Sequence, residues 1–312
     1  MSRQRYAIAI DLGGTGIKSA LVGTDGSVEH FHTVPTEAGQ GREALLSKLF
    51  RLIADHRRTA EQEGWPLLGI GVGTAGTVDS FGTVAYATEH LPGWTGTPLR
   101  KLLEQEFGLP CVVVNDVHAI ALGEQWQGAA QGMANLICVA LGTGIGGCII
   151  RNGAIFAGDD GYAGGFGHHI IAMGGLPCSC GNRGCWENYA SVSGLKLLMR
   201  EQGAPGLWIE NPRELFAQAR GGDSLAKEIV ALYGERIAIG LANLTHTLNS
   251  RHFLLAGAIT GQGEFLLENI REPLHRMVMP VYQGDGIHLY PAGLGEQAGV
   301  MGAASIVPGM RE

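Results

Sequence analysis

Apolar residues near the start of the chain fall in short runs that end at glycines or at a carboxylate. The run YAIAI at residues 6–10 breaks at DLGGTG, and IKSALV follows at 17–22, which predicts two strands joined by a turn built of glycines. LLGIGVG at 67–73 and CVVVND at 111–116 are continuously apolar, as expected of fully buried strands. We expect Asp116 at the carboxyl end of its strand, where open α/β sheets place ligands.

Helical patterns alternate with these strands. Residues 44–62 repeat apolar side chains at helical spacing among charged neighbours, which predicts an amphipathic helix. Thr97 and Pro98 are typical of a helix start, with a capping hydroxyl and a first-turn proline, and Gly108 is typical of a helix end. Further helices are expected over 188–200, 212–220, 224–249, 264–278 and 297–306, and further strands over 252–260 and 287–290.

The pattern of residues 6–26 recurs 129 positions later, at 135–155. YAIAIDLGGTGIKSALVGTDG is similar to NLICVALGTGIGGCIIRNGAI, because each has an apolar strand, a glycine turn, a second strand and a D-G or N-G turn. The echo predicts two duplicated α/β lobes that face each other across a cleft. The alternative is that two glycine-rich hairpins resemble each other by chance.

Composition and charge narrow the classes of function. The chain has 312 residues, of which 45% are hydrophobic, as in globular proteins large enough for two lobes. A net charge of -7 without a long basic run argues against nucleic acid or an anionic membrane as the main partner. We see no leader segment and no apolar stretch near the roughly 18 residues of a membrane span, so we expect a cytoplasmic protein with reduced thiols.

Two glycine turns have the residue types of phosphate-binding loops, although no Walker pattern occurs. Adjacent glycines let the backbone approach an anion, a threonine adds a hydroxyl, a lysine adds charge, and a carboxylate can hold magnesium through water. The alternative for one turn alone is a plain β-turn, but the second turn favours a pair of phosphate loops. The candidate residues are Asp11, Gly13, Gly14, Thr15 and Lys18 in the first turn, and Gly142, Thr143 and Gly144 in the second.

Three of the six cysteines lie in the stretch GHHIIAMGGLPCSCGNRGCWE. Cys178, Cys180 and Cys185 form a C-x-C-x4-C pattern, whose thiolates can converge on one tetrahedral zinc ion. Free thiols or a disulfide are the alternatives, and the expected reducing compartment favours metal. A fourth ligand is needed, and His168 and His169 are both near. The other three cysteines stand singly in apolar strands and are expected in the core.

Four motifs occur in a defined order: DLGGTGIK, VNDVHAIALGE, LGTGIGGC and CSCGNRGCWE. In this order and spacing they resemble the ROK family (repressors, open reading frames and sugar kinases) over nearly the whole chain. The resemblance implies an α/β fold with two duplicated ribonuclease-H-like lobes, the actin-like ATPase fold, around a central cleft. We expect residues 1–118 with 297–312 to form a small lobe, and 119–296 a large lobe with the zinc loop and the nucleotide site.

The resemblance also assigns roles to individual residues. It implies that Asp116 takes the proton of the attacking hydroxyl, whereas the residues alone leave open that Asp116 caps the next helix. It selects His168 as the fourth ligand of a structural zinc ion and places Gly257 near the adenine. The residues expected to bind sugar are Gly76, His90, Asn115, Asp116, His168 and Glu187.

The chain departs from the family pattern at four places. Gly165 stands where the family usually has a sugar-binding glutamate, His90 and His118 stand where it has asparagines, and Ala256-Gly257-Ala258 replaces three glycines. The missing carboxylate leads to the hypothesis that the substrate differs from glucose at or near C2, or that His90 and His169 supply other contacts. The alternative is that water fills the gap and a common hexose binds.

These features predict an ATP-dependent sugar kinase that acts on a hydroxyl such as the 6-OH of a hexose, with magnesium as cofactor and a homodimeric assembly. The alternative is a catalytically weak or inactive sugar-sensing regulator of the same family. A DNA-binding repressor is not expected, since only ten residues precede Asp11 and the net charge is negative. The motifs leave open which sugar and anomer bind, the oligomer size, and whether ATP or polyphosphate is the donor.

Overall fold

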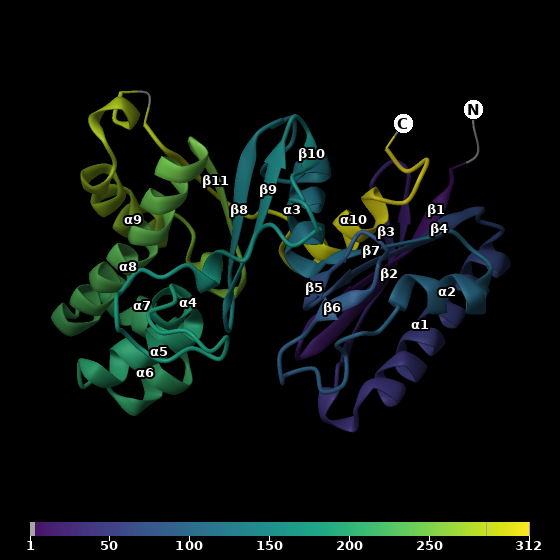
Figure 1. Cartoon of the computed structure of the whole chain (residues 1–312), viewed down its shortest axis with the longest axis horizontal. Helices are drawn as coiled ribbons and strands as arrows, with labels where there is room; N and C mark the ends of the chain where they lie inside the picture. Colours follow the sequence, from purple (N-terminus) through teal and green to yellow (C-terminus); the bar gives the residue numbers. More distant parts are fainter. Residues whose placement is uncertain (1–3, 285, 312) are drawn as a thin grey trace. The chain divides into compact units, whose positions relative to one another are not determined.

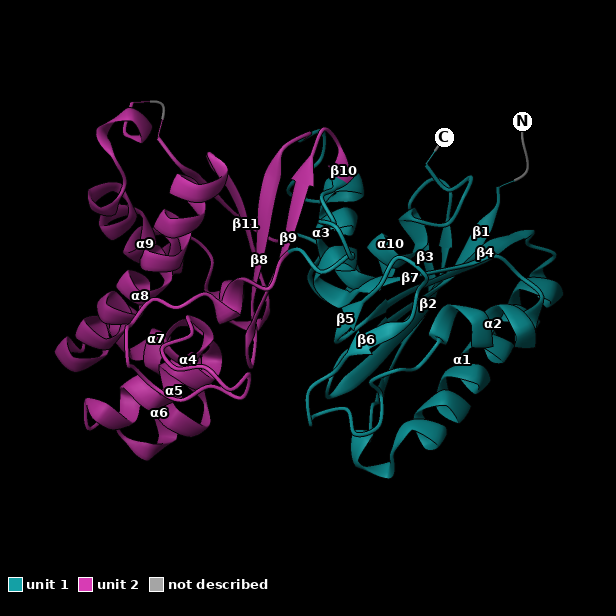
Figure 2. Cartoon of the chain, viewed as in Figure 1, with its two compact units in different colours: residues 1–133, 155–163, 293–312 teal, residues 134–154, 164–292 magenta. Residues whose placement is uncertain are grey.

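The chain forms two compact units, each with its own five-stranded sheet. The computed structural model describes residues 4–284 and 286–311. Unit 1 comprises residues 1–133, 155–163 and 293–312, and unit 2 comprises residues 134–154 and 164–292 (Figure 2).

The sheet of unit 1 combines an antiparallel meander with two parallel strands, in the order β3-β2-β1-β4-β7. Helices α1 and α2 cover one face of this sheet, and α3 and α10 cover the other (Figure 1). The elements are β1 (Tyr6–Leu12), β2 (Gly16–Gly23), β3 (Val28–Pro35), α1 (Arg42–Glu63), β4 (Leu67–Thr74), α2 (Leu99–Phe107), β7 (Cys111–Asn115), α3 (Asp116–Gln127) and α10 (Ala298–Ser305), with a small hairpin of β5 (Thr77–Val78) and β6 (Val84–Tyr86).

Small residues let α3 and α10 pack closely. A Cβ atom at Gly302 would lie 1.6 Å from the carbonyl oxygen of Ala119, so only glycine allows this approach. The predicted closing helix of small residues is therefore present, and it holds α3 against the sheet of unit 1.

The sheet of unit 2 has the order β10-β9-β8-β11-β12, with one large apolar core between the sheet and its helices. Its elements are β8 (Leu136–Leu141), β9 (Ile145–Arg151), β10 (Ala154–Ile155), α4 (Glu187–Ala190), α5 (Val192–Glu201), α6 (Gly206–Glu210), α7 (Pro212–Gly221), α8 (Ser224–Leu248), β11 (His252–Ala256), α9 (Glu264–Met277) and β12 (His288–Pro291). Short 3-10 helices span Ala38–Gln40, Phe166–His168, Ala258–Gln262, Pro280–Tyr282 and Gly295–Gln297.

The two sheets share one topology. In each, three antiparallel strands in sequence are followed by two parallel strands on the other side of the first strand. The glycine turns occupy equivalent places, between β1 and β2 and between β8 and β9. The predicted duplication is confirmed at the level of strand order.

The units divide the chain differently from the expected lobes. Residues 119–133, 155–163 and 293–296 belong to unit 1, although we expected them in the large lobe. The physical reason for 119–133 is that α3 is one continuous helix, which packs on α10.

Three predicted element ends are wrong. Thr97 does not cap α2, because its backbone forms a bridge with Val84 and its buried hydroxyl has no partner among the described residues. The helix expected over 188–200 breaks at Ser191, whose extended backbone and hydroxyl start α5. The strand expected to reach residue 260 ends at Ala256, because Gly257 turns with a φ of 99°.

Two simpler expectations concern apolar segments. The lone cysteines are buried, at 1% exposure for Cys111 and 0% for Cys138 and Cys148. Over residues 4–284 and 286–311, no helix has both the length and the apolar character required to cross a bilayer.

Candidate active site and metal site

Thr36 stabilises the glycine turn of unit 1 through two hydrogen bonds. The Gly13 N–H donates to the Gly16 carbonyl at 2.9 Å, and the Thr36 hydroxyl donates to the Gly13 carbonyl at 2.7 Å. The Thr36 N–H donates to the Thr15 carbonyl at 3.0 Å. The N–H groups of Gly14 and Thr15 have no acceptor within the described residues, and a Cβ at Gly14 would meet open space. These amides are available to an anion, as a phosphate loop requires. Thr36 was missed from the sequence.

Asp11 and Lys18 form an ion pair beside this turn. The antiparallel register places them opposite each other on β1 and β2, and Lys18 Nζ lies 3.2 Å from Asp11 Oδ2. Asp11 is only 5% exposed, and burial raises the pKa of its carboxyl while Lys18 opposes that shift. A Cβ at Gly299 of α10 would lie 2.4 Å from Asp11 Oδ2, so glycine makes room for this carboxylate.

Asn115, and not Asp116, caps α3. The Asn115 Oδ1 atom accepts the Val117 N–H at 2.9 Å, and its Nδ2 donates to the Gly76 carbonyl and to Asp116 Oδ1, each at 2.9 Å. The alternative reading of Asp116 as the helix cap is therefore wrong, since Asp116 is the first residue of α3. Asn115 therefore links the Gly76 loop, the Asp116 carboxylate and the first turn of α3.

The Asp116 carboxylate has one oxygen held and one oxygen open. Its Oδ1 accepts from Val117 N at 3.0 Å and from Asn115 Nδ2, whereas Oδ2 takes part in no hydrogen bond within the described residues. Burial raises the pKa of Asp116 to about 6, and the charge of Asp11 adds to the shift. A carboxyl with this pKa is ionised at neutral pH and can still accept a proton.

The loop around Gly76 adjoins Asp116, because Asn115 Nδ2 donates to both of them. Gly76 has a φ of 105°, and a Cβ there would lie 2.7 Å from the Tyr86 carbonyl oxygen, so glycine is required. His90 is exposed and has no hydrogen bond to the described residues. His118 is buried, with Nε2 3.3 Å from the Ala163 carbonyl, and burial lowers its pKa.

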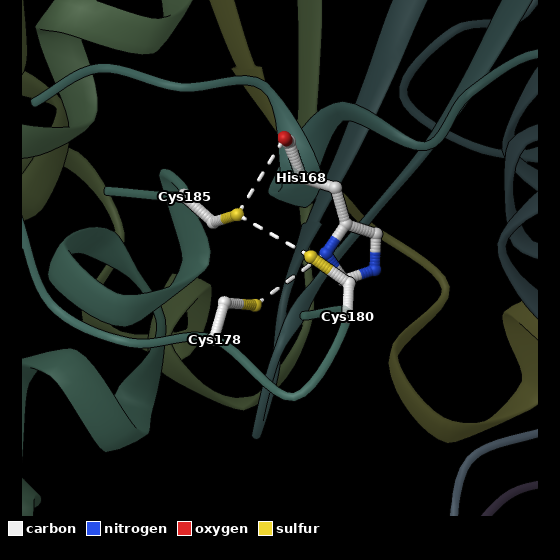
Figure 3. Close-up of side chains that lie close together, drawn as sticks. All are labelled: His168, Cys178, Cys180 and Cys185. Carbon is white, nitrogen blue, oxygen red and sulfur yellow. Dashed lines mark hydrogen bonds between the residues drawn. The ribbon is translucent and has the colours of Figure 1, made fainter. Parts of the chain in front are cut away.

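In unit 2 four side chains converge as a metal site would require (Figure 3). One ligand atom from each of His168, Cys178, Cys180 and Cys185 lies within 4.8 Å of all the others. Cys178 Sγ is 3.7 Å from His168 Nδ1, and Cys180 Sγ is 3.6 Å from Cys185 Sγ. These separations fit a tetrahedral ion with bonds of roughly 2.0 to 2.3 Å to nitrogen and sulfur, and the donor set suits zinc.

His169 does not join this cluster. Its ring stacks on Trp186 with a centroid distance of 5.1 Å, and its buried Nε2 has no hydrogen-bond partner in the described part of the chain. Trp186 is fully buried against Gly240, and its indole N–H donates to the Arg236 carbonyl at 2.9 Å. The stack holds His169 away from the thiols, which agrees with the assignment of His168.

Glu187 lies between the cysteine cluster and the second glycine turn. Its Oε1 accepts from Cys178 Sγ at 3.2 Å and lies 3.5 Å from His168 Nδ1. Its Oε2 would be 2.7 Å from a Cβ at Gly144. The Glu187 carboxylate therefore lies against both the cysteine cluster and the second glycine turn.

Gly165 is exposed, and a Cβ there would meet no atom within 4 Å.

The turn of residues 142–144 is held by the start of α5. The Gly142 N–H donates to the Gly144 carbonyl at 3.0 Å, two residues on, whereas the Gly13 N–H of the first turn donates to a carbonyl three residues on. The Ser193 hydroxyl donates to the Thr143 carbonyl at 2.9 Å, and a Cβ at Gly257 would lie 2.4 Å from the Leu141 carbonyl oxygen. Ser193 was missed, because no local pattern links it to a turn 50 residues earlier.

Comparison with known proteins gives a consistent set of relatives. The sequence pattern of the ROK family matches residues 7–310. A glucokinase from Halalkalibacterium halodurans is 32% identical over 97% of this chain and 95% of its own length. A xylose repressor from Caldicellulosiruptor bescii is 31% identical over 96% of this chain and 77% of its own. A ROK family glucokinase from Streptomyces griseus, solved with glucose and AMPPNP, has a TM-score of 0.83 at 31% identity, covering 97% of this chain and 99% of that one.

Proposed function

The chain belongs to the ROK family and is a carbohydrate kinase, and we propose that it transfers the γ-phosphate of ATP to the 6-hydroxyl of a hexose with Asp116 as the base. The observation that carries the catalytic role is the Asp116 carboxylate, with one oxygen fixed by two donors and the other open. Its pKa of about 6 leaves it ionised at neutral pH, ready to take the hydroxyl proton.

We assign the triphosphate to the two glycine turns. The amides of Gly14 and Thr15 are open to an anion, and the turn at Gly142 to Gly144 occupies the equivalent place in the second sheet, between β8 and β9. The Asp11 and Lys18 pair fits magnesium held through water, with the lysine facing phosphate charge. Magnesium, when bound, neutralises charge on the phosphates. Gly257 is the residue proposed on the adenine side.

Zinc has a structural role in this proposal. Four ligands would fill a tetrahedral shell, which leaves no open position for catalysis. Bound zinc fixes the loop that carries Glu187, and His168 and Glu187 are the proposed contacts to sugar hydroxyls. In unit 1, Asn115 and Gly76 are the proposed sugar contacts nearest to Asp116.

The identity of the sugar depends on Gly165 and on His90. The relatives named as glucokinases support a hexose, and one solved relative holds glucose. The open space at Gly165 supports a substrate with a substituent near C2. The alternative is that water fills this space and plain glucose binds. His90 is the proposed additional contact.

The test is a coupled ADP assay with glucose, mannose, N-acetylated amino sugars and cyclitols, with ATP or polyphosphate as donor. We expect at least one hexose to be phosphorylated, and Asp116→Asn to lower kcat by roughly 10² to 10⁴. An Asp116→Asn protein with the parent's kcat would remove the base assignment. The 31% identity to a xylose repressor keeps a sugar sensor as the second candidate. Sugar binding without turnover on every acceptor would favour that sensor.

A further inference from the structure

Glu124 is a fully buried carboxylate that bonds two distant backbone segments. It lies near the end of α3 and is 0% exposed. Its Oε2 accepts the Ala129 N–H at 2.8 Å, and its Oε1 accepts the Leu294 N–H at 2.8 Å. None of the ion pairs found among the described residues includes Glu124. A buried charge without a counter-ion depends on such donors, so both amides stabilise it.

The two amides belong to the segments by which the chain leaves and re-enters unit 1. The chain passes out of unit 1 after Met133 and returns at Gly293. Ala129 lies shortly before the first of these points, and Leu294 directly after the second. The chain passes between the two units at four points. The Glu124 carboxylate bonds to the segments beside two of them, with one oxygen for each segment.

The same helix presents the proposed base. α3 begins at Asp116 and runs without a break to Gln127. Close packing on α10 immobilises it, since a Cβ at Gly123 would lie 2.2 Å from the Ala298 carbonyl oxygen. Asp116, Glu124 and both bonded segments are thus parts of one rigid assembly.

We propose that Glu124 is a positioning residue that fastens both connections to the helix carrying Asp116. This inference rests on the proposed function. In phosphoryl transfer, the position of the base Asp116 must be maintained while the kinase changes conformation. Glu124 acts through the two segments and touches no substrate.

The informative variant is Glu124→Gln, which keeps the size of the side chain. Its amide nitrogen cannot accept an N–H, so either Ala129 or Leu294 loses its bond. We expect faster hydrogen exchange at one of these two amides, with the rest of unit 1 unchanged. We also expect kcat and KM for the sugar to change together, with kcat/KM lower by about tenfold, as for hinge substitutions.

The matched control is Leu103→Ala, in the core of unit 1 but remote from both segments. Leu103 is 0% exposed on α2, so its truncation should lower the melting temperature of the protein. Assayed well below both melting temperatures, Leu103→Ala should keep the parent's kcat and KM, whereas Glu124→Gln should not. A merely structural Glu124 would behave like Leu103.

Two results would overturn the proposal: parental kcat and KM in Glu124→Gln, or unchanged exchange at both amides. If Glu124→Gln does not fold, Glu124→Asp keeps the charge on a shorter side chain and takes the same two measurements. If the parent and Leu103→Ala phosphorylate no sugar, the kinase proposal fails. The exchange rates at Ala129 and Leu294 still decide whether the carboxylate holds both segments.

Discussion

Asp116 owes its chemistry to neighbours that treat its two oxygens differently. The Asn115 amide and the Val117 N–H hold Oδ1, and burial with the nearby Asp11 raises the pKa to about 6. Because of the raised pKa, the fraction of Asp116 that is ionised changes with pH close to neutrality.

Activity should therefore fall in mild acid. Because Asp116 must be ionised, kcat/KM should be level above about pH 7 and should drop roughly tenfold for each pH unit below about 6. The measurement is kcat/KM between pH 4.5 and 8.5, with Asp55→Asn on the exposed side of α1 as control. A profile flat down to pH 4.5 would contradict the assignment.

Gly165 is a residue at which a larger side chain should alter selectivity without harming the fold. A Cβ there meets open space, so Gly165→Glu should change the melting temperature little. A new carboxylate accepting from a 2-hydroxyl should raise the preference for glucose over C2-substituted sugars by about tenfold. Competition assays measure this ratio, and Gly165→Gln separates charge from size. An unchanged ratio would place the sugar away from Gly165.

The candidate residues could be selected from the sequence, but their bonding could not. Either Asn115 or Asp116 has the side chain of a helix cap, and the choice depends on which of them is the last extended residue. Thr36 and Ser193 support turns that are far from them in sequence, so no local pattern reveals them.

At the scale of elements, α1 carries a buried imidazole against β3. His56 is 3% exposed, and its Nε2 has no hydrogen-bond partner among residues 4–284 and 286–311. The His56 ring lies 5.7 Å from that of His32. Burial lowers the pKa of His56 to about 4, the charges of His32 and His30 add to this, and Asp55 opposes it. The folded protein therefore resists protonation at this site.

This contact should make the fold acid-labile. The unfolded chain binds the proton first, so the stability contributed by neutral His56 is complete above pH 6.5 and is lost as the pH falls toward 4, by up to roughly 3 kcal/mol. His56→Phe should be more stable than the parent at pH 5 in urea unfolding, with a smaller difference at pH 7.5. His275→Phe, at an exposed position, is the control. Equal pH dependence in His56→Phe and the parent would contradict this account.

Buried strands and amphipathic helices were predictable, whereas polar edge strands were not. β1, β4 and β7 are apolar on both faces and stand out as continuous runs. β3, with the sequence VEHFHTVP, exposes half of its side chains and bulges near His30, so its alternation is weak. Packing on β2, rather than its own pattern, makes it a strand.

At the scale of the whole molecule, each unit encloses its own apolar core. The duplication was visible because both glycine hairpins keep their pattern, but the unit boundary was not. It follows from the packing of α3 on α10, which joins residues near 120 to residues near 300. The homodimer and the cytoplasmic location remain predictions.

Separate cores should give separate responses to metal removal. A zinc chelator should lower the unfolding transition of unit 2, where the four ligands lie, and leave that of unit 1 in place. Differential scanning calorimetry measures both transitions, and His56→Phe at pH 5 identifies that of unit 1. Cys180→Ser should already show the lowered transition and should not respond further to the chelator. An equal shift of both transitions would contradict a local role for the metal.

The stack of His169 on Trp186 also gives the molecule an optical reporter. Trp186 follows Cys185 and precedes Glu187 in the sequence, and its indole is fully buried. If that loop loosens, water should reach the ring and shift its fluorescence emission to longer wavelength. With the other four tryptophans changed to phenylalanine, fluorescence would record the state of the loop in real time, and a constant spectrum during chelation would show that the loop keeps its structure without the ion.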